Sequence, residues 1–328
     1  MSEYPLSDLK VLDFSRVVAG PYATRMLSDL GADVLKVEPP EGDVTRHFGS
    51  KKVGGVAGFY LQQNIGKRNI CLDLKTEGAR AIALKLAAEA DIVVENFRPG
   101  VMAKFGLGWE DLRKVNPKLV MLSISGFGQD GPEVGRAAYA PILHAESGLV
   151  ARQAQISGGP PTDMQFAMGD SYSSLHGLVA VMAALRVAEK TGRGQQVDIA
   201  ILNALHSSDD YAHWALDDNW PKPPENLVWE GPEGRPILIV GDMKWLWHLF
   251  SKKEGLTDPT PEGADLDTKV RLRTEALEGR IKGFTSFGAL TEKLDALNLA
   301  WGEVREFNKG VYNQESIKHR GIIVDVAD

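Results

Sequence analysis

Over its first 130 residues the chain alternates short apolar runs with longer segments whose apolar residues recur at helical spacing. The short runs predict five strands: Lys10–Phe14, Asp33–Val37, Asn69–Leu74, Asp91–Phe97 and Leu119–Ser125. The segments Gly20–Leu30 and Glu77–Ala90 predict helices, the first with Pro21 in its opening turn and the second with Thr76 as its N-cap. Strands that alternate with helices in this way predict a parallel sheet covered by helices on both faces.

A helical block follows, and then the character of the sequence changes. Ala137–Val150 predicts one helix, and Ser171–Thr191 predicts a second that is apolar on most faces and therefore central. Val197–Leu202 continues the core. After about residue 215, Asp217–Pro224 is rich in turn and breaker residues and predicts a linker.

A second, smaller unit occupies the rest of the chain. It begins with a predicted strand at Pro236–Val240 and ends with another at Gly321–Val326. Between them the spacing of apolar residues predicts three helices: Trp245–Lys253, Thr268–Lys282 and Phe287–Leu297. We therefore expect a large domain over residues 1–215, a linker over 216–232 and a small domain over 233–328.

The composition excludes several classes of protein. Of 328 residues 43% are hydrophobic and 25% charged, and a net charge of −7 argues against a nucleic-acid partner, which calls for a basic face. The N-terminus lacks a signal pattern, and no stretch reaches the roughly 18 apolar residues of a membrane span. The single cysteine, Cys71, excludes an internal disulfide, and neither it nor the seven histidines show metal-ligand spacing. We expect a buried Cys71, no metal site, no membrane contact and a cytoplasmic location.

One glycine-rich segment resembles a dinucleotide-binding loop. Gly126–Gly131 (GFGQDG) matches G-x-G-x-x-G and follows a predicted strand. However, Pro132 and Glu133 come next instead of an apolar helix, and the first strand–helix unit, where that motif usually lies, holds only Gly20. We therefore expect a loop whose glycines let the backbone bend near a ligand, and not a nicotinamide site.

Basic residues gather where a parallel sheet binds its ligands, beyond the carboxyl ends of the strands. Arg98 ends a buried strand, and Arg16 and Lys75 also follow strand ends. Further cations lie nearby in the sequence: Arg46, Lys67, Arg68, Lys104 and Arg136. Each alone is an ordinary surface charge, but together on an acidic chain they fit a phosphorylated ligand.

Asp170 is the candidate for covalent chemistry. It stands just before the predicted helix Ser171–Thr191, so one interpretation is a plain helix N-cap. The other is a nucleophile, since a helix N-terminus stabilises the carboxylate anion that a nucleophile requires. In this second interpretation Gly169, which has no side chain, would let a substrate approach closely.

Several stretches, taken as a set, carry a resemblance. The first runs from Leu9–Ser15 through Ala19–Pro21 and Leu27–Val34 to Lys36–Pro40. The others are Asn64–Arg68, Leu72–Lys75, Glu95–Gly100, Gly126–Gly128, Gly169–Asp170 and Lys190–Gln195. Over roughly residues 6–205 the chain resembles the family III CoA-transferases of the CaiB/BaiF type, which include formyl-CoA transferase.

The resemblance implies an α/β fold with a doubly wound, mostly parallel Rossmann-like large domain and a second, smaller α/β domain. It implies a homodimer whose two chains interlock like rings. It also implies an enzyme that moves CoA between an acyl-CoA thioester and a free carboxylic acid, with no permanently bound cofactor. Asp170 falls on the catalytic aspartate, which forms an acyl anhydride and then a CoA thioester. The CoA contacts fall on Arg16, Val17, Ala19, Leu72, Lys75, Asn96, Phe97, Arg98, Lys104, Phe105 and Arg136.

Two departures from the family keep alternatives open. Family members usually continue past the final strand and return to the large domain, which weakens the expected interlocking and leaves a non-catalytic CoA-binding protein as an alternative. The second half also lacks the glycine-run loop of formyl-CoA transferases, so formyl and oxalyl substrates are less favoured. An acyl-CoA racemase is a further alternative, but the stretch Arg136–Ala140 lacks the Gly-His-Asp histidine of racemases, and His144 is out of register.

Overall fold

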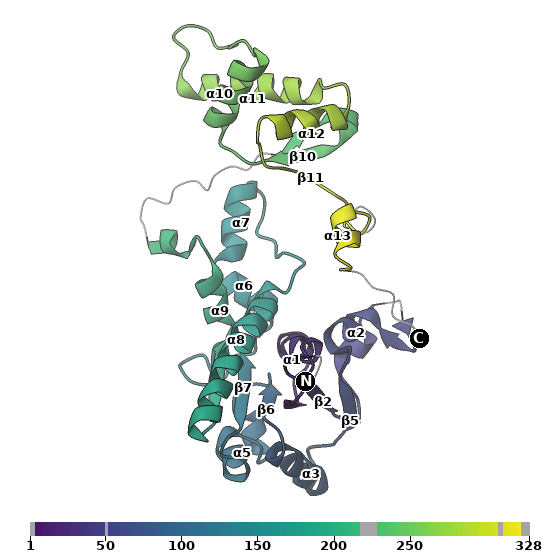
Figure 1. Cartoon of the computed structure of the whole chain (residues 1–328). Helices are drawn as coiled ribbons and strands as arrows, with labels where there is room; N and C mark the ends of the chain where they lie inside the picture. Colours follow the sequence, from purple (N-terminus) through teal and green to yellow (C-terminus); the bar gives the residue numbers. More distant parts are fainter. Residues whose placement is uncertain (1–3, 50–51, 217–227, 308–310, 323–328) are drawn as a thin grey trace. The chain divides into compact units, whose positions relative to one another are not determined.

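The computed structural model describes residues 4–49, 52–216, 228–307 and 311–322 (Figure 1). The chain divides into two compact units, with the boundary between residues 220 and 221. Each unit has its own hydrophobic core. None of the helices in the described ranges is long and apolar enough to cross a membrane.

The first unit is built on a sheet of six parallel strands. Their spatial order is β5 (Arg68–Cys71), β2 (Asp33–Glu38), β1 (Lys10–Asp13), β6 (Ile92–Glu95), β7 (Val120–Ser125) and β8 (Gln195–Ala200). The chain starts at β1, winds outward through β2 to β5 and returns to β6 on the other side of β1. The strand order therefore reverses between β1 and β6, and the doubly wound, mostly parallel fold is confirmed.

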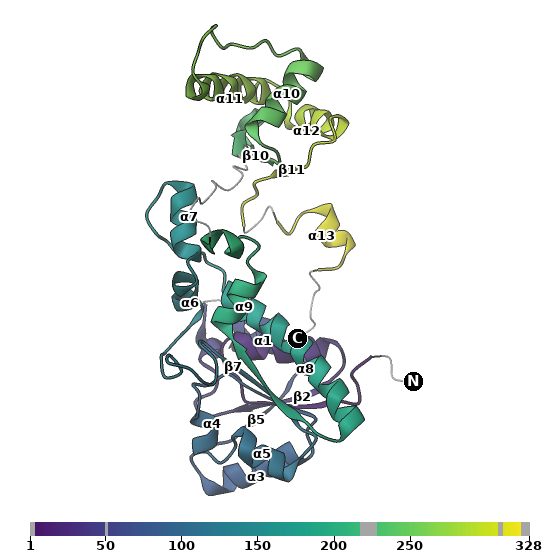
Figure 2. The same ribbon diagram turned by 90° about the vertical axis from the view of Figure 1, so that its left-hand side faces the viewer.

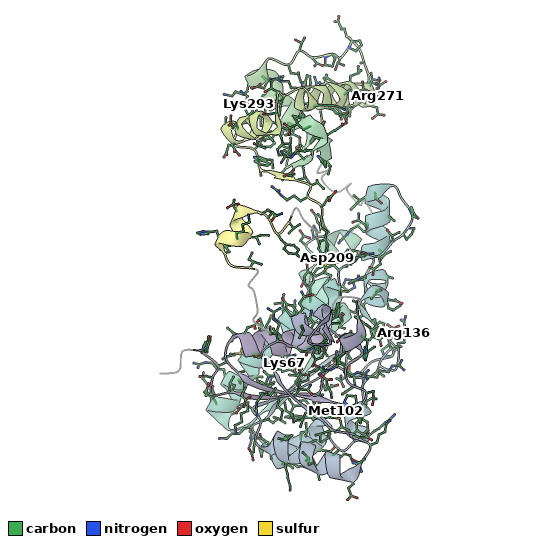
Figure 3. All side chains as sticks on the ribbon, turned by 90° about the vertical axis from the view of Figure 1, so that its right-hand side faces the viewer. Lys67, Met102, Arg136, Asp209, Arg271 and Lys293 are labelled. Atoms are coloured by element: carbon green, nitrogen blue, oxygen red, sulfur yellow. The ribbon has the colours of Figure 1, made fainter. Side chains whose placement is uncertain are left out.

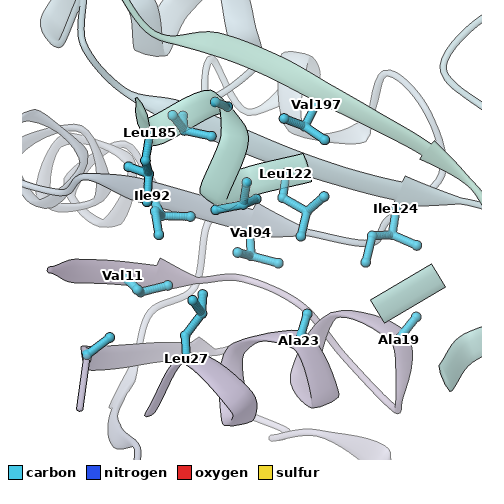
Figure 4. Close-up of a cluster of buried hydrophobic side chains, with 14 of the residues drawn as sticks. Val11, Ala19, Ala23, Leu27, Ile92, Val94, Leu122, Ile124, Leu185 and Val197 are labelled. Atoms are coloured by element: carbon cyan, nitrogen blue, oxygen red, sulfur yellow. The ribbon is translucent and has the colours of Figure 1, made fainter. Parts of the chain in front are cut away.

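Helices cover both faces of this sheet, because successive strand residues point to opposite faces. Val11 and Val94 pack on the face covered by α1 (Ala19–Asp29) and α8 (Met168–Thr191) (Figure 4). Helix α9 (Ile201–Ser208) packs beside α8. Leu12 and Val93 pack on the face covered by α3 (Glu77–Ala88), α4 (Val101–Lys104) and α5 (Trp109–Val115). Figure 2 shows α3 and α5 on one side of the strands and α1 and α8 on the other.

The elements around this frame differ from the sequence prediction in places. The segment predicted as one helix over residues 137–150 forms α6 (Ala140–Glu146) and α7 (Leu149–Ser157), because Gly148 breaks it with φ +83°. The sequence also missed the hairpin of β3 (Lys52–Val53) and β4 (Val56–Ala57) and the following α2 (Gly58–Asn64).

Two burial predictions were wrong. Cys71 is exposed, because it ends β5 at the edge of the sheet. Helix α8 is not central on every side, because the side away from the sheet exposes Leu175, Val179 and Met182.

The second unit holds a three-stranded antiparallel sheet with β10 (Pro236–Ile239) between β9 (Val228–Glu230) and β11 (Trp301–Glu303). Its helices are α10 (Met243–Glu254), α11 (Leu266–Lys282), α12 (Phe287–Ala296) and α13 (Glu315–His319). Ile237, Phe250 and Leu290 form the centre of its core. Strand β9 lies within the residues expected to form a linker, of which 217–227 lie outside the described residues. Most of the predicted final strand, residues 323–326, also lies outside them.

Candidate functional site

A cavity of about 240 Å³ opens in the first unit where the strand order reverses. Its walls come from the segments that follow β1, β6 and β7 and from the start of α8. Eight residues that the sequence singled out line this one cavity: Arg16, Val17, Ala19, Asn96, Phe97, Arg98, Arg136 and Asp170. The topology brings them together, because the carboxyl ends of neighbouring parallel strands meet at one edge of the sheet.

Four of the expected CoA contacts lie elsewhere. Leu72 and Lys75 follow β5, which is two strands away from β1 at the edge of the sheet. Lys104 is the last residue of α4, and Phe105 caps that helix and packs against the second core cluster. None of these four lines the cavity.

The segment after β1 is held in a strained conformation. Val17 has φ +66°, a region that costs a β-branched residue of order 1–3 kcal/mol. The Asn96 side chain holds Arg16, the residue before Val17, by two hydrogen bonds. Its oxygen accepts from the Arg16 amide at 2.7 Å, and its nitrogen donates to the Arg16 carbonyl at 2.8 Å. The Val17 amide donates to the Asp43 carboxylate at 3.1 Å. Asn96 and Asp43 therefore shape this wall of the cavity by holding its backbone.

Buried lysine and aspartate side chains also contact the segment that follows β1. Lys36 is fully buried, donates to the Ser15 carbonyl at 2.7 Å and lies 3.5 Å from the Asp43 carboxylate. Lys67 donates to the Asp13 carboxylate at 3.1 Å and to the Pro21 carbonyl at 2.8 Å. Two lysines and two aspartates thus balance one another under the turn that leads into α1.

The pKa values in this cluster reflect that balance. Burial alone would raise the pKa of Asp13, but Lys67, Lys36 and hydroxyl donors lower it to about 2. Burial lowers the pKa of Lys67 to about 8, and Asp13 opposes that shift. Asp13 is therefore an anion at neutral pH, paired with lysine side chains that water does not reach.

Several cations that the sequence offered for a phosphorylated ligand are engaged within the protein. Lys67 belongs to the buried cluster, Arg46 pairs with Glu38 at 2.7 Å, and Arg68 pairs with Asp33 at 2.5 Å. Arg136, labelled in Figure 3, pairs with Glu133 and Glu146 and lies 4.7 Å from the centre of the Phe127 ring. By contrast, no carboxylate in the described part of the chain pairs with Arg16 or Arg98. These two guanidinium groups are the ones in the cavity wall that can meet an anionic ligand.

The carboxyl of Asp170 lies at the start of α8, and it is not the helix N-cap. The N-cap is Ala167, and Asp170 is the third residue of the helix. Burial raises the pKa of Asp170 from 3.8 to about 6. At pH 7 a carboxyl with this pKa is about 90% ionised. The site therefore holds a half-buried carboxylate that is more basic than an ordinary aspartate.

The space that a side chain at position 169 would occupy is filled by protein, contrary to the expectation that it is open to a substrate. A Cβ atom at this position would lie 2.8 Å from Ile201 Cγ2, 3.4 Å from Leu205 Cδ1 and 3.6 Å from His144 Nε2. Helix α9 and His144 therefore pack directly on the backbone of α8. The glycine is needed for the close contact between these helices.

We expect Gly169→Ala to lower the free energy of unfolding by about 1–3 kcal/mol, because its Cβ overpacks a buried contact. Urea denaturation measures the change. Gly78→Ala in α3 is the matched control, since a Cβ there meets nothing within 4 Å. That control should be neutral or stabilising by up to about 1 kcal/mol, as is usual for glycine in a helix. Equal losses in the two variants would contradict the packing described for Gly169.

The glycine-rich segment after β7 is not a dinucleotide loop. No helix opens after Gly131, and the next one is α6, which begins at Ala140. A Cβ at Gly126 would lie 2.4 Å from the Cβ of Ala138, so this glycine permits close packing within the segment. Gly126 and Phe127 form part of the cavity wall, as a loop bending near a ligand would.

The sequence did not single out several residues of the cavity wall. Val18, Val44, Tyr139 and Ile201 line it, and Tyr139 is largely exposed. These residues come from four separate segments, so only tertiary structure unites them. Within the described ranges, no group of three or more His, Cys, Asp or Glu side chains could hold a metal ion.

Comparisons with known proteins agree on one family. The family described as CoA-transferase family III matches residues 6–328. The β subunit of succinyl-CoA–L-malate CoA-transferase from Chloroflexus aurantiacus is 40% identical over 63% of this chain and 51% of its own length. Succinate–glutarate CoA-transferase from Agrobacterium fabrum is 42% identical over 61% of this chain and 51% of its own. The chain thus matches about half the length of these curated relatives.

Solved structures extend the likeness to nearly the whole chain. A CaiB/BaiF family protein from Brucella suis is 30% identical, with a TM-score of 0.84 over 99% of this chain and 90% of that one. The Rv3272 protein of Mycobacterium tuberculosis is 29% identical, with a TM-score of 0.78 over 98% of this chain and 88% of that one. Both units of the present chain therefore have counterparts in solved structures.

Proposed function

The chain belongs to CoA-transferase family III, and on that premise we propose that it transfers CoA from an acyl-CoA thioester to a free carboxylic acid, with Asp170 as the covalent carrier. One observation carries the proposal. The half-buried Asp170 carboxyl, with its pKa raised to about 6, faces the cavity that is also lined by Arg16 and Arg98, which pair with no carboxylate among the described residues. A basic carboxylate beside fixed positive charge suits attack on a thioester whose other end carries phosphates.

The proposed reaction begins with two acyl transfers. The Asp170 carboxylate attacks the thioester carbonyl of the donor acyl-CoA, forming a mixed anhydride and expelling the CoA thiolate. The thiolate then attacks the aspartyl carbonyl, giving an aspartyl-CoA thioester and releasing the donor acid, which carries one former Asp170 oxygen. The acceptor carboxylate reverses both steps, forming its own CoA thioester and leaving one of its oxygens on Asp170. No proton or external energy source is consumed, because a thioester is made for each one broken.

Binding of the CoA portion is proposed to involve both the residues of the cavity wall and the more distant set. Arg16, Val17, Ala19, Asn96, Phe97, Arg98 and Arg136 would contact the part near Asp170. Leu72, Lys75, Lys104 and Phe105 lie outside the cavity and remain proposals for the far end of the ligand. Interactions remote from the reacting carbonyl can supply binding energy for the chemical step.

We expect Arg98→Ala to weaken CoA binding by about 10- to 100-fold, the usual effect of losing charge-assisted hydrogen bonds. Isothermal titration calorimetry with CoA measures the change. Arg113→Ala removes an exposed guanidinium of α5, outside the cavity, and should bind CoA like the unaltered protein. Equal affinity in the Arg98 variant and the unaltered protein would make Arg98 a plain surface charge.

The transfer rate should depend on pH through the ionisation of Asp170. The anion is the nucleophile, so the rate should fall about tenfold for each unit of pH below 6 and be level above it. The single-turnover rate of CoA release between pH 4.5 and 8 measures this. A rate that stays level down to pH 4.5, as an ordinary aspartate with a pKa of 3.8 would give, would contradict the raised pKa of Asp170.

The racemase alternative is not supported by the geometry around Asp170. A racemase needs a histidine free to take the α-proton. His144 is the histidine near Asp170, but its Nε2 already accepts a hydrogen bond from the Gly169 amide at 3.1 Å. That lone pair is unavailable to a substrate.

The substrates named for the relatives guide the choice of substrates to test. They include succinyl-CoA with L-malate, succinate with glutarate, and acetyl-CoA with oxalate, the last in a protein from Acetobacter aceti. We propose a short dicarboxylic acid as acceptor. The test is a screen of succinyl-, acetyl- and formyl-CoA against ¹³C-labelled malate, glutarate, oxalate and acetate, followed by mass spectrometry of the CoA esters. Label in a dicarboxyl-CoA ester supports the proposal; α-proton exchange with solvent and no label would favour a racemase, and bound CoA without either would favour a binding protein.

We propose a homodimer as the working assembly, as the family resemblance implies. The exposed apolar side chains of α8, among them Leu175, Val179 and Met182, offer a surface for a second copy of the chain.

The cytoplasm is the proposed location, since the one cysteine, Cys71, is an exposed thiol of the kind that reducing compartments preserve.

A further inference from the structure

His144, on α6, is fully buried and joins two segments on either side of its ring. Its Nδ1 lies 2.8 Å from Asp163 Oδ1, and its Nε2 accepts the Gly169 amide hydrogen at 3.1 Å. A carboxylate can only accept, so the proton resides on Nδ1 and the lone pair on Nε2. The two bonds together fix both the tautomer and the plane of the imidazole ring.

This arrangement replaces a feature that α8 lacks. The N-cap of α8 is Ala167, whose methyl group cannot accept a hydrogen bond from the first-turn amides. His144, from another helix, accepts from the second residue of α8 instead. A side chain that caps a helix in this way contributes about 0.5–2 kcal/mol.

The hydrogen bond between the Gly169 amide and His144 affects the position of the Asp170 carboxyl. Asp170 follows Gly169 in the chain, so the bond to the Gly169 amide restrains the backbone from which the Asp170 side chain leaves the helix. A second bond, from the Ser174 hydroxyl to the Ala19 carbonyl at 2.5 Å, ties the same part of α8 to α1. His144 itself does not line the cavity, so it acts on the site only through α8.

We infer that His144, oriented by Asp163, is a positioning residue that aims Asp170 into the cavity for the transfer reaction proposed above, on which this inference rests. Asp163 contributes by holding the imidazole in the tautomer whose Nε2 can accept. Misplacement of a reacting group by about 1 Å can lower a rate about 100-fold. In the proposed complex other residues of the cavity bind the CoA portion of the substrate. Loss of a positioning residue should therefore lower kcat and leave KM unchanged.

The test compares four single-residue variants of the full chain with the unaltered protein. For each, kcat and KM are measured on the best donor and acceptor pair. His144→Ala should lower kcat about 10- to 100-fold with KM within about twofold. His144→Gln retains an oxygen that can accept from Gly169 and should recover kcat to within about fivefold of the unaltered protein. Asp163→Asn, which changes a partly exposed side chain, should lower kcat about 3- to 10-fold. The control His176→Ala, an exposed residue of α8, should change neither constant.

The outcomes separate this inference from the proposed function. If the unaltered protein transfers CoA but His144→Ala retains its kcat, the inference is wrong and the function stands. A folded glutamine variant as slow as the alanine variant also overturns the inference, because the retained acceptor would then not matter. If the unaltered protein transfers no CoA with any tested pair, while it still binds CoA, the proposed function fails. The stability of each variant, measured by thermal unfolding, identifies any that fails to fold, and the glutamine and Asp163 variants then decide.

Discussion

Replacing Asp170 with asparagine should lower CoA transfer by a factor of about 10⁴ or more, the usual result of removing a covalent nucleophile. The amide has nearly the shape of the carboxylate, so the cavity and the contacts of Arg16 and Arg98 should be preserved. Affinity for CoA should therefore stay within about twofold of the unaltered protein. Steady-state transfer and calorimetric titration with CoA measure the two effects separately.

The Asp170→Asn variant should also differ from the unaltered protein in its free energy of unfolding. Burial raises the pKa of Asp170 above its unfolded value, so the stability that the carboxyl confers is present below about pH 4 and is lost as the pH rises through about 6. At pH 8 the asparagine variant escapes that cost and should be as stable as the unaltered protein, or more stable by up to about 3 kcal/mol. Asp130→Asn, at an exposed position in the loop after β7, is the control and should change neither activity nor stability. Retained turnover in the Asp170 variant would reject the covalent mechanism.

Replacing Lys36 with methionine should lower the free energy of unfolding by about 3–5 kcal/mol, the usual cost of breaking a buried ion pair. Lys36 is fully buried, and its removal leaves the Asp43 carboxylate without its cation and the Ser15 carbonyl without its donor. Because Asp43 also holds the strained Val17 amide, the change should disturb the cavity wall. Urea denaturation and CoA affinity measure the two consequences.

Lys85→Met is the matched control, since Lys85 is an exposed residue of α3. It should change the free energy of unfolding by no more than about 0.5 kcal/mol, as surface substitutions do. A similarly small effect in the Lys36 variant would show that the buried cluster is not needed to hold the turn after β1.

The parts of the fold that follow from local pattern could be predicted from the sequence. The apolar runs Lys10–Phe14 and Asp91–Phe97 gave β1 and β6, since alternating strands and helices leave few arrangements other than a parallel sheet. That topology in turn explains why Arg16 and Arg98, far apart in the chain, line one cavity. Residues that follow strand ends converge without any knowledge of side-chain contacts.

The parts that depend on tertiary contact could not be predicted. Nothing in the sequence near Gly169 reveals that Ile201 and His144 pack against it, so its role was misjudged. Lys67 looked like a cation for a ligand, but the fold buries it against Asp13. The sequence also gives no measure of desolvation, which raises the pKa of Asp170. In each case a neighbour from a distant segment decides the outcome.

The fate of the oxygen atoms of Asp170 tests the covalent mechanism most directly. The protein is incubated with an acyl-CoA donor and an acceptor acid labelled with ¹⁸O in its carboxylate. It is then digested with a protease, and the mass of the peptide that contains Asp170 is measured by mass spectrometry. We expect this peptide to gain ¹⁸O during turnover, and fragmentation to place the label on Asp170. Transfer that proceeds with no ¹⁸O on Asp170, or with the label on another carboxylate, would contradict it.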